Sequence, residues 1–177
     1  MERSRVVLLA VLAVGLVLDG PPADGSAATS TAIASEAAVE QRIAAVVHAR
    51  NPTLSRSESE RIGRAVVRSA SRFGLDPELV TAVLIVESDG RPWARSRKGA
   101  VGLMQVMPYM VEGMHMAGNL TTIESNVEAG CLILADNIRR LGEDDGISAY
   151  FWGSNIRGVA YLDRVRAAHA AVRRFES

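Results

Sequence analysis

The chain has 177 residues, of which 48% are hydrophobic, 5% aromatic and 23% charged, and its formal net charge is zero. This length suffices for one domain with a core, and the apolar content excludes disorder over most of the chain. The balanced charge argues against a general nucleic-acid partner. One cysteine excludes an intrachain disulfide, and His48, His115 and His169 lack metal-ligand spacing. The sequence therefore predicts neither a metal nor a cofactor.

The first residues have the composition of an export signal. Two arginines among the first five residues precede an apolar run over residues 6–18, and a Pro-Pro pair follows. A helix of this length spans about 20 Å, which is less than the ~30 Å hydrocarbon core of a bilayer. We therefore expect residues 1–28 to be a signal peptide cleaved near Ala28, leaving no stable membrane span. An uncleaved anchor is the alternative.

The pattern after the leader is helical. Residues 29–35 are small and polar and are expected to form a linker ahead of an amphipathic helix over residues 37–49. A second helix is expected to start with a capping box formed by Ser57 and Glu60, and to end at Gly74.

Further start and stop signals continue to the end of the chain. Asp76 followed by Pro77 is typical of a helix start, and residues 128–141 and 158–175 have helical periodicity. We find no convincing alternating strand. The sequence therefore predicts an all-α protein with a signal peptide (1–28), a linker and N-terminal helix (29–57) and one helical domain (58–177).

A glutamate occupies the apolar face of the helix that starts at Pro77. The apolar stripe of this helix consists of Leu79, Val80, Val83 and Leu84, and Glu87 is the next residue on it. A carboxyl group forced against apolar surroundings has a raised pKa, which a general acid needs near neutral pH. The alternative is that Glu87, in the last helical turn, faces solvent or pairs with Arg91.

A glycine-containing segment follows a basic loop at residues 95–98. Residues 99–108 read Gly-Ala-Val-Gly-Leu-Met-Gln-Val-Met-Pro, in which Gln105 is a polar amide among apolar side chains. An amide offers both a donor and an acceptor, which suits the N-acetyl and hydroxyl groups of a sugar. The alternative is that Gln105 lies on a helix surface and that the methionines fill the core.

These segments resemble the signature of bacterial lytic transglycosylases of the soluble, goose-lysozyme-like type. The resemblance rests on Ile-Val-Glu-Ser at 85–88, on the segment at 99–108 and on the eighteen-residue separation of Glu87 and Gln105. Three later segments are also similar to family motifs, namely Asn126-Val-Glu-Ala-Gly130, Ala149-Tyr-Phe-Trp-Gly153 and Tyr161-Leu-Asp-Arg-Val165. The resemblance covers about residues 60–168 and implies a lysozyme-like helical domain.

The resemblance also implies site residues. It gives Glu87 the catalytic role and five further residues substrate-binding roles, namely Ser88, Ser96, Gln105, Met107 and Tyr150. Ser96 matches a serine that contacts an N-acetyl group, and Tyr150 matches a tyrosine close to the catalytic acid. Phe151 departs from the family, which usually has asparagine there, and this puts substrate contacts at that end of the cleft in doubt.

The implied reaction is cleavage of the MurNAc-β-1,4-GlcNAc bond of peptidoglycan by a lytic transglycosylase. Glu87 would protonate the leaving oxygen while the N-acetyl group of the sugar attacks, so that no second carboxylate such as Asp89 is needed. Glu87 would then take the proton of the muramyl 6-hydroxyl, giving a 1,6-anhydro product. The alternatives are a hydrolytic lysozyme on the same substrate and a non-catalytic scaffold that binds the wall.

This reading also implies a location and partners. The protein would be exported and be periplasmic or associated with the cell wall, with peptidoglycan glycan strands as its partner. A secretion or conjugation apparatus is a candidate second partner, for which the enzyme would open or remodel the wall locally. The basic loop at 95–98 either is solvated or attracts the acidic peptide stems of the wall.

Overall fold

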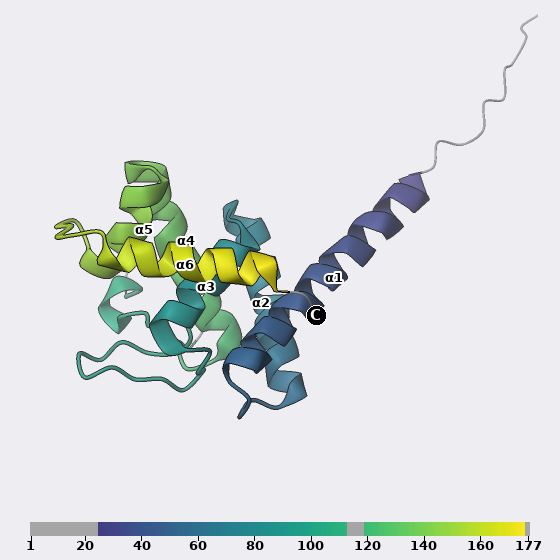
Figure 1. Cartoon of the computed structure of the whole chain (residues 1–177), viewed down its shortest axis with the longest axis horizontal. Helices are drawn as coiled ribbons and strands as arrows, with labels where there is room; N and C mark the ends of the chain where they lie inside the picture. The colour runs from purple at the N-terminus through teal and green to yellow at the C-terminus, as the bar shows by residue number, and fades with distance from the viewer. Residues whose placement is uncertain (1–24, 113–118, 176–177) are drawn as a thin grey trace, which may run out of the picture.

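The protein is built from helices. A computed structural model describes residues 25–112 and 119–175, and Figure 1 shows the arrangement of their helices. The helices are α1 (Gly25–Arg50), α2 (Arg56–Phe73), α3 (Pro77–Ser88), the short 3-10 helix η1 (Pro108–Met110), α4 (Ile123–Leu141), α5 (Glu143–Trp152) and α6 (Ala160–Arg174). The described residues form no β-strand and contain only isolated β-bridges besides these helices. The predicted all-α class is therefore confirmed.

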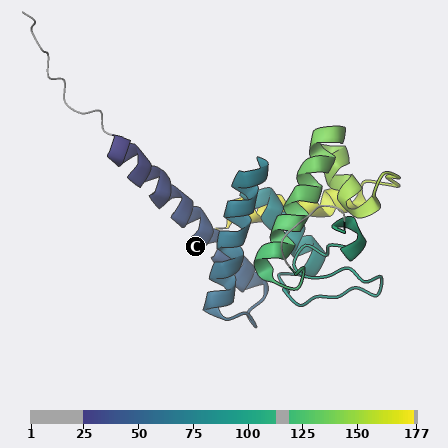
Figure 2. The ribbon, with the colours of Figure 1, turned by 180° about the vertical axis from the view of Figure 1, so that it is seen from behind.

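The N-terminal helix differs from the prediction. Residues 29–35, expected as a linker, are helical because α1 already begins at Gly25. Figures 1 and 2 show the first half of α1 extending away from the other helices, and residues 33–38 are exposed. Most of the predicted signal peptide, residues 1–24, lies outside the described residues. Among the helices that are described, none is long and apolar enough to cross a membrane.

The second half of α1 belongs to the packed body. Ile43 and Val47 are fully buried in the hydrophobic core. Gly63 of α2 allows α1 to come close, because a Cβ atom at this glycine would lie 2.4 Å from the Glu40 carbonyl oxygen. The core therefore includes residues that precede the predicted domain start at residue 58.

Local signals fix the ends of α2 and α3. The capping box of α2 is formed by Ser55 and Glu58, so the prediction of Ser57 and Glu60 is wrong by two residues. Gly74 adopts a left-handed conformation and closes α2, as predicted. Asp76 caps α3 by accepting a hydrogen bond from the Glu78 amide at 2.9 Å, again as predicted.

The core surrounds α3, the helix that carries Glu87. Val80, Val83 and Leu84 of this helix are fully buried. Helices α2 and α6 pack on α3, and α4 packs on α2 and α5. Helix α5 was not predicted as a helix; its Gly146 lies so close to α4 that a Cβ there would be 2.5 Å from the Ile138 Cα. The end of α3 is thus held from several sides.

Candidate active site

Glu87 lies in the last turn of α3, where its carboxyl group is partly buried. The Tyr161 hydroxyl of α6 donates a hydrogen bond of 2.7 Å to Glu87 Oε1. Burial raises the pKa of Glu87, while the Tyr161 hydrogen bond and the positive charge of Arg164 offset part of this rise. Arg91, the partner in the alternative interpretation, donates instead to the Ser88 carbonyl oxygen at 2.8 Å.

Ser88, the neighbour of Glu87, points into the protein. Its side chain is 1% exposed, and its hydroxyl donates to the Leu84 carbonyl oxygen at 3.1 Å and accepts from the Arg91 amide at 3.3 Å. These bonds close the C-terminal end of α3. Ser88 does not reach the groove in which the other predicted residues meet.

That groove has a volume of about 720 Å³ and runs between the loop after α3 and the C-terminal part of α5. It brings together five of the six predicted site residues, namely Glu87, Ser96, Gln105, Met107 and Tyr150. Trp152, whose position the sequence left open, also lines it, as do Phe151 and Tyr109. Aromatic faces and polar groups therefore surround one acid, which is the composition of a sugar-binding groove.

Hydrogen bonds from Asn126 of α4 hold the loop that carries Gln105. The Asn126 amide accepts from the Met104 amide at 2.8 Å and donates to the carbonyl oxygens of Val101 and Leu120 at 2.8 and 2.9 Å. Gly102 must be glycine, since its φ is +79° and a Cβ would lie 2.3 Å from the Asn126 Nδ2 atom. Asn126 was quoted in the resemblance but was not predicted as a site residue.

Gln105 itself adopts a left-handed backbone conformation, with φ of 47°. Its Nε2 atom donates to the Gly102 and Ala94 carbonyl oxygens at 3.0 and 3.3 Å. These bonds hold the amide in place at the groove and use its donors within the loop. Ser96 is exposed, and its hydroxyl accepts from the Ala100 amide at 3.0 Å.

Two tyrosines lie near Glu87, and they are fixed differently. Tyr150 donates to the Met104 carbonyl oxygen at 2.8 Å, so its hydroxyl proton is directed to the loop rather than to Glu87. Tyr161 is the residue that contacts Glu87. Burial raises the pKa of both phenols, which keeps them protonated as donors. Sequence reasoning missed the role of Tyr161, although Tyr161 opens one of the motifs that it singled out.

The family model for the transglycosylase SLT domain matches residues 64–164, which include every residue of this site. The chain belongs to this family. An SLT domain is what the resemblance at residues 82–108 predicted, and that prediction is confirmed.

Curated relatives agree with this assignment over shorter spans. A transglycosylase of Enterobacteria phage PRD1 is 35% identical over 97 residues, covering 54% of this chain and 35% of the phage protein. An endo-type membrane-bound lytic murein transglycosylase A of Klebsiella pneumoniae is 46% identical over 41 residues, covering 23% of this chain and 20% of that protein. The chain thus spans about a third or less of the length of these relatives.

A solved structure is also similar. An inactive mutant of the lytic transglycosylase Slt from Pseudomonas aeruginosa matches with a TM-score of 0.46 and 23% sequence identity. The match covers 62% of this chain and 22% of the Slt chain.

In this SLT domain Phe151, at a position where the family usually has asparagine, packs against neighbouring aromatic rings. The Phe151 ring stacks on the Tyr161 ring at a centroid distance of 5.0 Å and an interplanar angle of 15°, and Trp152 meets Phe151 edge-on at 4.9 Å. The Arg164 guanidinium also lies over the Tyr161 ring, at 5.6 Å. Phe151 therefore contacts the residue that holds Glu87.

A second, open hollow of about 720 Å³ borders Glu87 and is lined mainly by residues of α1, α3 and α6. Of the predicted residues it contains only Glu87 and Ser88. Asp89, the nearest other carboxylate along the chain, lies in this hollow and pairs with Arg50. Most of the predicted residues converge on the first groove, which is therefore the candidate active site.

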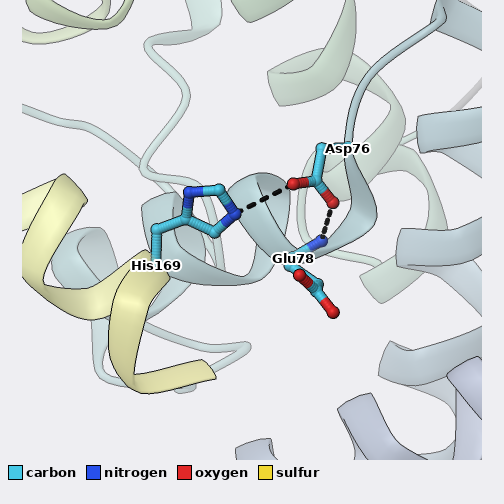
Figure 3. Close-up of side chains that lie close together, drawn as sticks. All are labelled: Asp76, Glu78 and His169. Atoms are coloured by element: carbon cyan, nitrogen blue, oxygen red, sulfur yellow. Dashed lines mark hydrogen bonds and ion pairs between the residues drawn. The ribbon is translucent and has the colours of Figure 1, made fainter. Parts of the chain in front are cut away.

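A separate cluster joins the start of α3 to α6, as Figure 3 shows. Asp76, Glu78 and His169 have ligand atoms within 4.8 Å of one another, a proximity that their sequence spacing did not indicate. The imidazole lies 2.9 Å from the Asp76 carboxylate, and Glu78 pairs with Arg42 and Arg173. Since two guanidinium groups oppose a cation at Glu78, we interpret the cluster as an ionic contact between helices.

Proposed function

We propose that this SLT domain is a lytic transglycosylase that cleaves the MurNAc-β-1,4-GlcNAc bond of peptidoglycan with Glu87 as its single catalytic acid. The observation that carries the proposal is the environment of Glu87. A partly buried carboxyl group with a raised pKa, held by Tyr161 and facing a groove, meets the requirements of a general acid near neutral pH. The family match and the lytic murein transglycosylase relative support the substrate.

The groove also favours one mechanism over its alternative. Among the described residues that line it, Glu87 is the only carboxylate. Glycosidases that work with two carboxyl groups need both at the scissile bond, with the second about 5–9.5 Å from the first. Asp89 faces the other hollow and is paired with Arg50. The groove therefore suits substrate-assisted chemistry better than a two-carboxylate hydrolysis.

No water molecule takes part in the two chemical steps. The N-acetyl oxygen of the muramyl unit attacks C1 as the C1–O4 bond breaks, and the Glu87 proton passes to the leaving O4 of the next sugar. The Glu87 carboxylate then removes the proton of the 6-hydroxyl. O6 attacks C1, the bond to the N-acetyl oxygen breaks, and a 1,6-anhydro end forms with Glu87 protonated again. Ser96 and Tyr150, both at the groove, would position the N-acetyl group.

The proposal extends to the setting of the reaction. Peptidoglycan lies outside the cytoplasmic membrane, so the protein must be exported to the periplasm or cell wall, and residues 1–28 would direct this export. Within the wall we propose local remodelling or opening for an envelope-spanning machine such as a secretion or conjugation apparatus.

Replacing Glu87 with glutamine tests the catalytic assignment. Glu87→Gln keeps the acceptor for the Tyr161 hydroxyl but cannot transfer a proton, so release of soluble muropeptides from purified sacculi should fall by at least about a hundredfold. Glu143→Gln, at an exposed position outside the groove, is the matched control and should retain activity. Full activity of a folded Glu87→Gln protein would contradict the proposal.

A further inference from the structure

Tyr161 is almost completely buried, although it lies in the first turn of α6, which is otherwise mostly exposed. The residue is 2% exposed, whereas Ala160, Asp163 and Arg164 of the same turn are exposed. A buried residue in an exposed turn must be covered by other elements. Part of this cover is Phe151 in the last turn of α5, whose ring stacks on the Tyr161 ring at a centroid distance of 5.0 Å.

The Phe151 ring joins this buried tyrosine to the groove. It is 52% exposed and lines the groove that contains Glu87, whereas Tyr161 does not line it. The interplanar angle of 15° with Tyr161 is that of a stacked pair, in which two flat faces share a large contact area. Trp152 meets Phe151 edge-on at 4.9 Å and adds a second aromatic contact. Phe151 therefore covers Tyr161 on the side of the groove.

The position of the Tyr161 ring matters because its hydroxyl donates to Glu87 Oε1 at 2.7 Å. Hydrogen bonds between two oxygens span about 2.5–3.0 Å and weaken steeply as their geometry departs from linear, so a ring displacement of about 0.5 Å would weaken this one. A ring stacked on Tyr161 opposes displacement toward the groove and keeps water from competing for the hydroxyl. A chain of contacts thus runs from Phe151 of α5 through Tyr161 of α6 to Glu87 of α3.

We propose that Phe151 is a positioning residue for Glu87, because its ring holds Tyr161 where the tyrosine hydroxyl can donate to the carboxyl group. The inference rests on the proposed function. An asparagine, the usual residue of the family at this position, has no ring to stack on Tyr161, so this restraint is a feature of the present chain. The other role open to a half-exposed ring in the groove is direct contact with a sugar, and the experiments below distinguish the two.

Replacing Phe151 changes none of the ionisable groups around Glu87. These groups come from α1, α5, α6, the turn after α3 and the loops at the groove. They are Tyr150, Tyr161, Arg164, Arg50, Asp89, Arg91, Arg97, Lys98 and Arg157. Leucine is apolar like phenylalanine, so Phe151→Leu removes the stacked ring but leaves an apolar side chain beside Tyr161. A changed titration of Glu87 in this variant therefore reports on the Tyr161 hydrogen bond.

Kinetics on soluble glycan fragments from sonicated sacculi test the role. Phe151→Leu should lower kcat about threefold to tenfold and leave KM within about twofold, since a stacked aromatic pair contributes an effect of this size. Phe151→Tyr keeps a ring and should retain most of kcat. The matched control Trp93→Leu removes a ring that is 58% exposed and lies outside both hollows, and it should behave like the wild type.

Two kinetic outcomes would overturn the proposal. A raised KM with unchanged kcat in Phe151→Leu would assign the ring to sugar contact, and unchanged kinetics would give it no role in the reaction.

A double-mutant cycle tests whether Phe151 acts through the Tyr161 hydroxyl. Tyr161→Phe keeps a ring beside Phe151 but removes the hydroxyl, so adding Phe151→Leu to it should change kcat by less than about twofold. Both single variants should move the alkaline limb of kcat/KM to higher pH, Phe151→Leu by the smaller amount, because a weakened hydrogen bond stabilises the Glu87 carboxylate less. Losses that multiply in the double variant, or a limb that moves to lower pH in Phe151→Leu, would refute this route.

Titration without substrate separates this inference from the proposed function. In protein labelled with 13C-glutamate, the carboxyl resonance of Glu87 is assigned by its absence from Glu87→Gln protein, and its pKa is measured in the wild type, Phe151→Leu and Trp93→Leu. The expected result is a higher pKa in Phe151→Leu alone. If the wild type cleaves no glycan but this shift is present, the proposed function fails while the positioning of Tyr161 by Phe151 stands; the same Glu87 pKa in all three proteins removes the positioning role.

Discussion

Opposing influences set the proton affinity of Glu87. Burial at the end of α3 disfavours the carboxylate and raises its pKa, whereas the Tyr161 hydroxyl and the Arg164 charge favour the carboxylate. An acid that must give up a proton and then take one back needs both influences, because either alone would fix it in one state. Phe151, stacked on Tyr161, holds the ring from which this hydroxyl extends.

Removing the Tyr161 hydroxyl should change the pH profile in a defined direction. Tyr161→Phe eliminates the bond that stabilises the carboxylate, so the pKa of Glu87 should rise further and the alkaline limb of kcat/KM should move to higher pH. Activity at the optimum should fall on the order of tenfold, because a hydrogen bond to a charged group contributes about 1.5–3 kcal/mol. The measurement is the pH dependence of muropeptide release.

Tyr150→Phe is the comparison for this experiment. The Tyr150 hydroxyl donates to the Met104 carbonyl oxygen, so its removal should weaken the loop but leave the alkaline limb in place. A limb that moves to lower pH in Tyr161→Phe, or that moves equally in both variants, would contradict the assignment of Tyr161 as the residue that tunes Glu87.

At the scale of the elements, the start of α3 matters because this helix positions Glu87. Asp76→Ala removes the N-cap and should cost about 1 kcal/mol of the free energy of unfolding, or about 2–4 °C in Tm. Asp76→Asn keeps an oxygen that can accept from the Glu78 amide, and should therefore cost less. Thermal unfolding at pH 7 measures both, and equal losses would show that the contact with His169, rather than the cap, carries the effect.

The sequence predicted the helix ends that are set by residues close together in the chain. Gly74, Asp76 and Pro77 are neighbours in the chain, so the end of α2 and the start of α3 could be predicted from them. The capping box of α2 was misplaced because Ser55 and Glu58 have the same spacing as Ser57 and Glu60. Helix α5 was missed since Gly146, which disfavours a helix, is required there by the close approach of Ile138.

The candidate site, like the fold, could be predicted from the sequence only in part. The position of Glu87 on an apolar face followed from periodicity within one helix, whereas Ser96, Met107 and Tyr150 were implied only by the family resemblance. The hydrogen bond from Tyr161 to Glu87 and the stacking of Phe151 on Tyr161 depend on how α3, α5 and α6 pack. Such contacts have no signature in local spacing, so the sequence could not predict them.

For the whole molecule, the two halves of α1 should contribute unequally to stability. A chain that starts at residue 36 loses the start of α1, including the exposed residues 33–35, and its Tm should lie within about 2 °C of the longer chain. A chain that starts at residue 51 loses the fully buried Ile43 and Val47, and its Tm should fall by at least about 8 °C. Thermal unfolding followed by circular dichroism measures both, and equal stability of the two chains would place the domain start after α1.

In the proposed mechanism, one carboxylic acid at the end of α3 cleaves the glycan without a hydrolytic water. Mass spectrometry of the muropeptides that the wild-type protein releases from purified sacculi distinguishes this mechanism from hydrolysis. We expect products ending in 1,6-anhydro-MurNAc, each lighter by one water than the corresponding hydrolysis product, and no products from Glu87→Gln. Products with a free reducing end would instead show hydrolysis and contradict the single-acid mechanism.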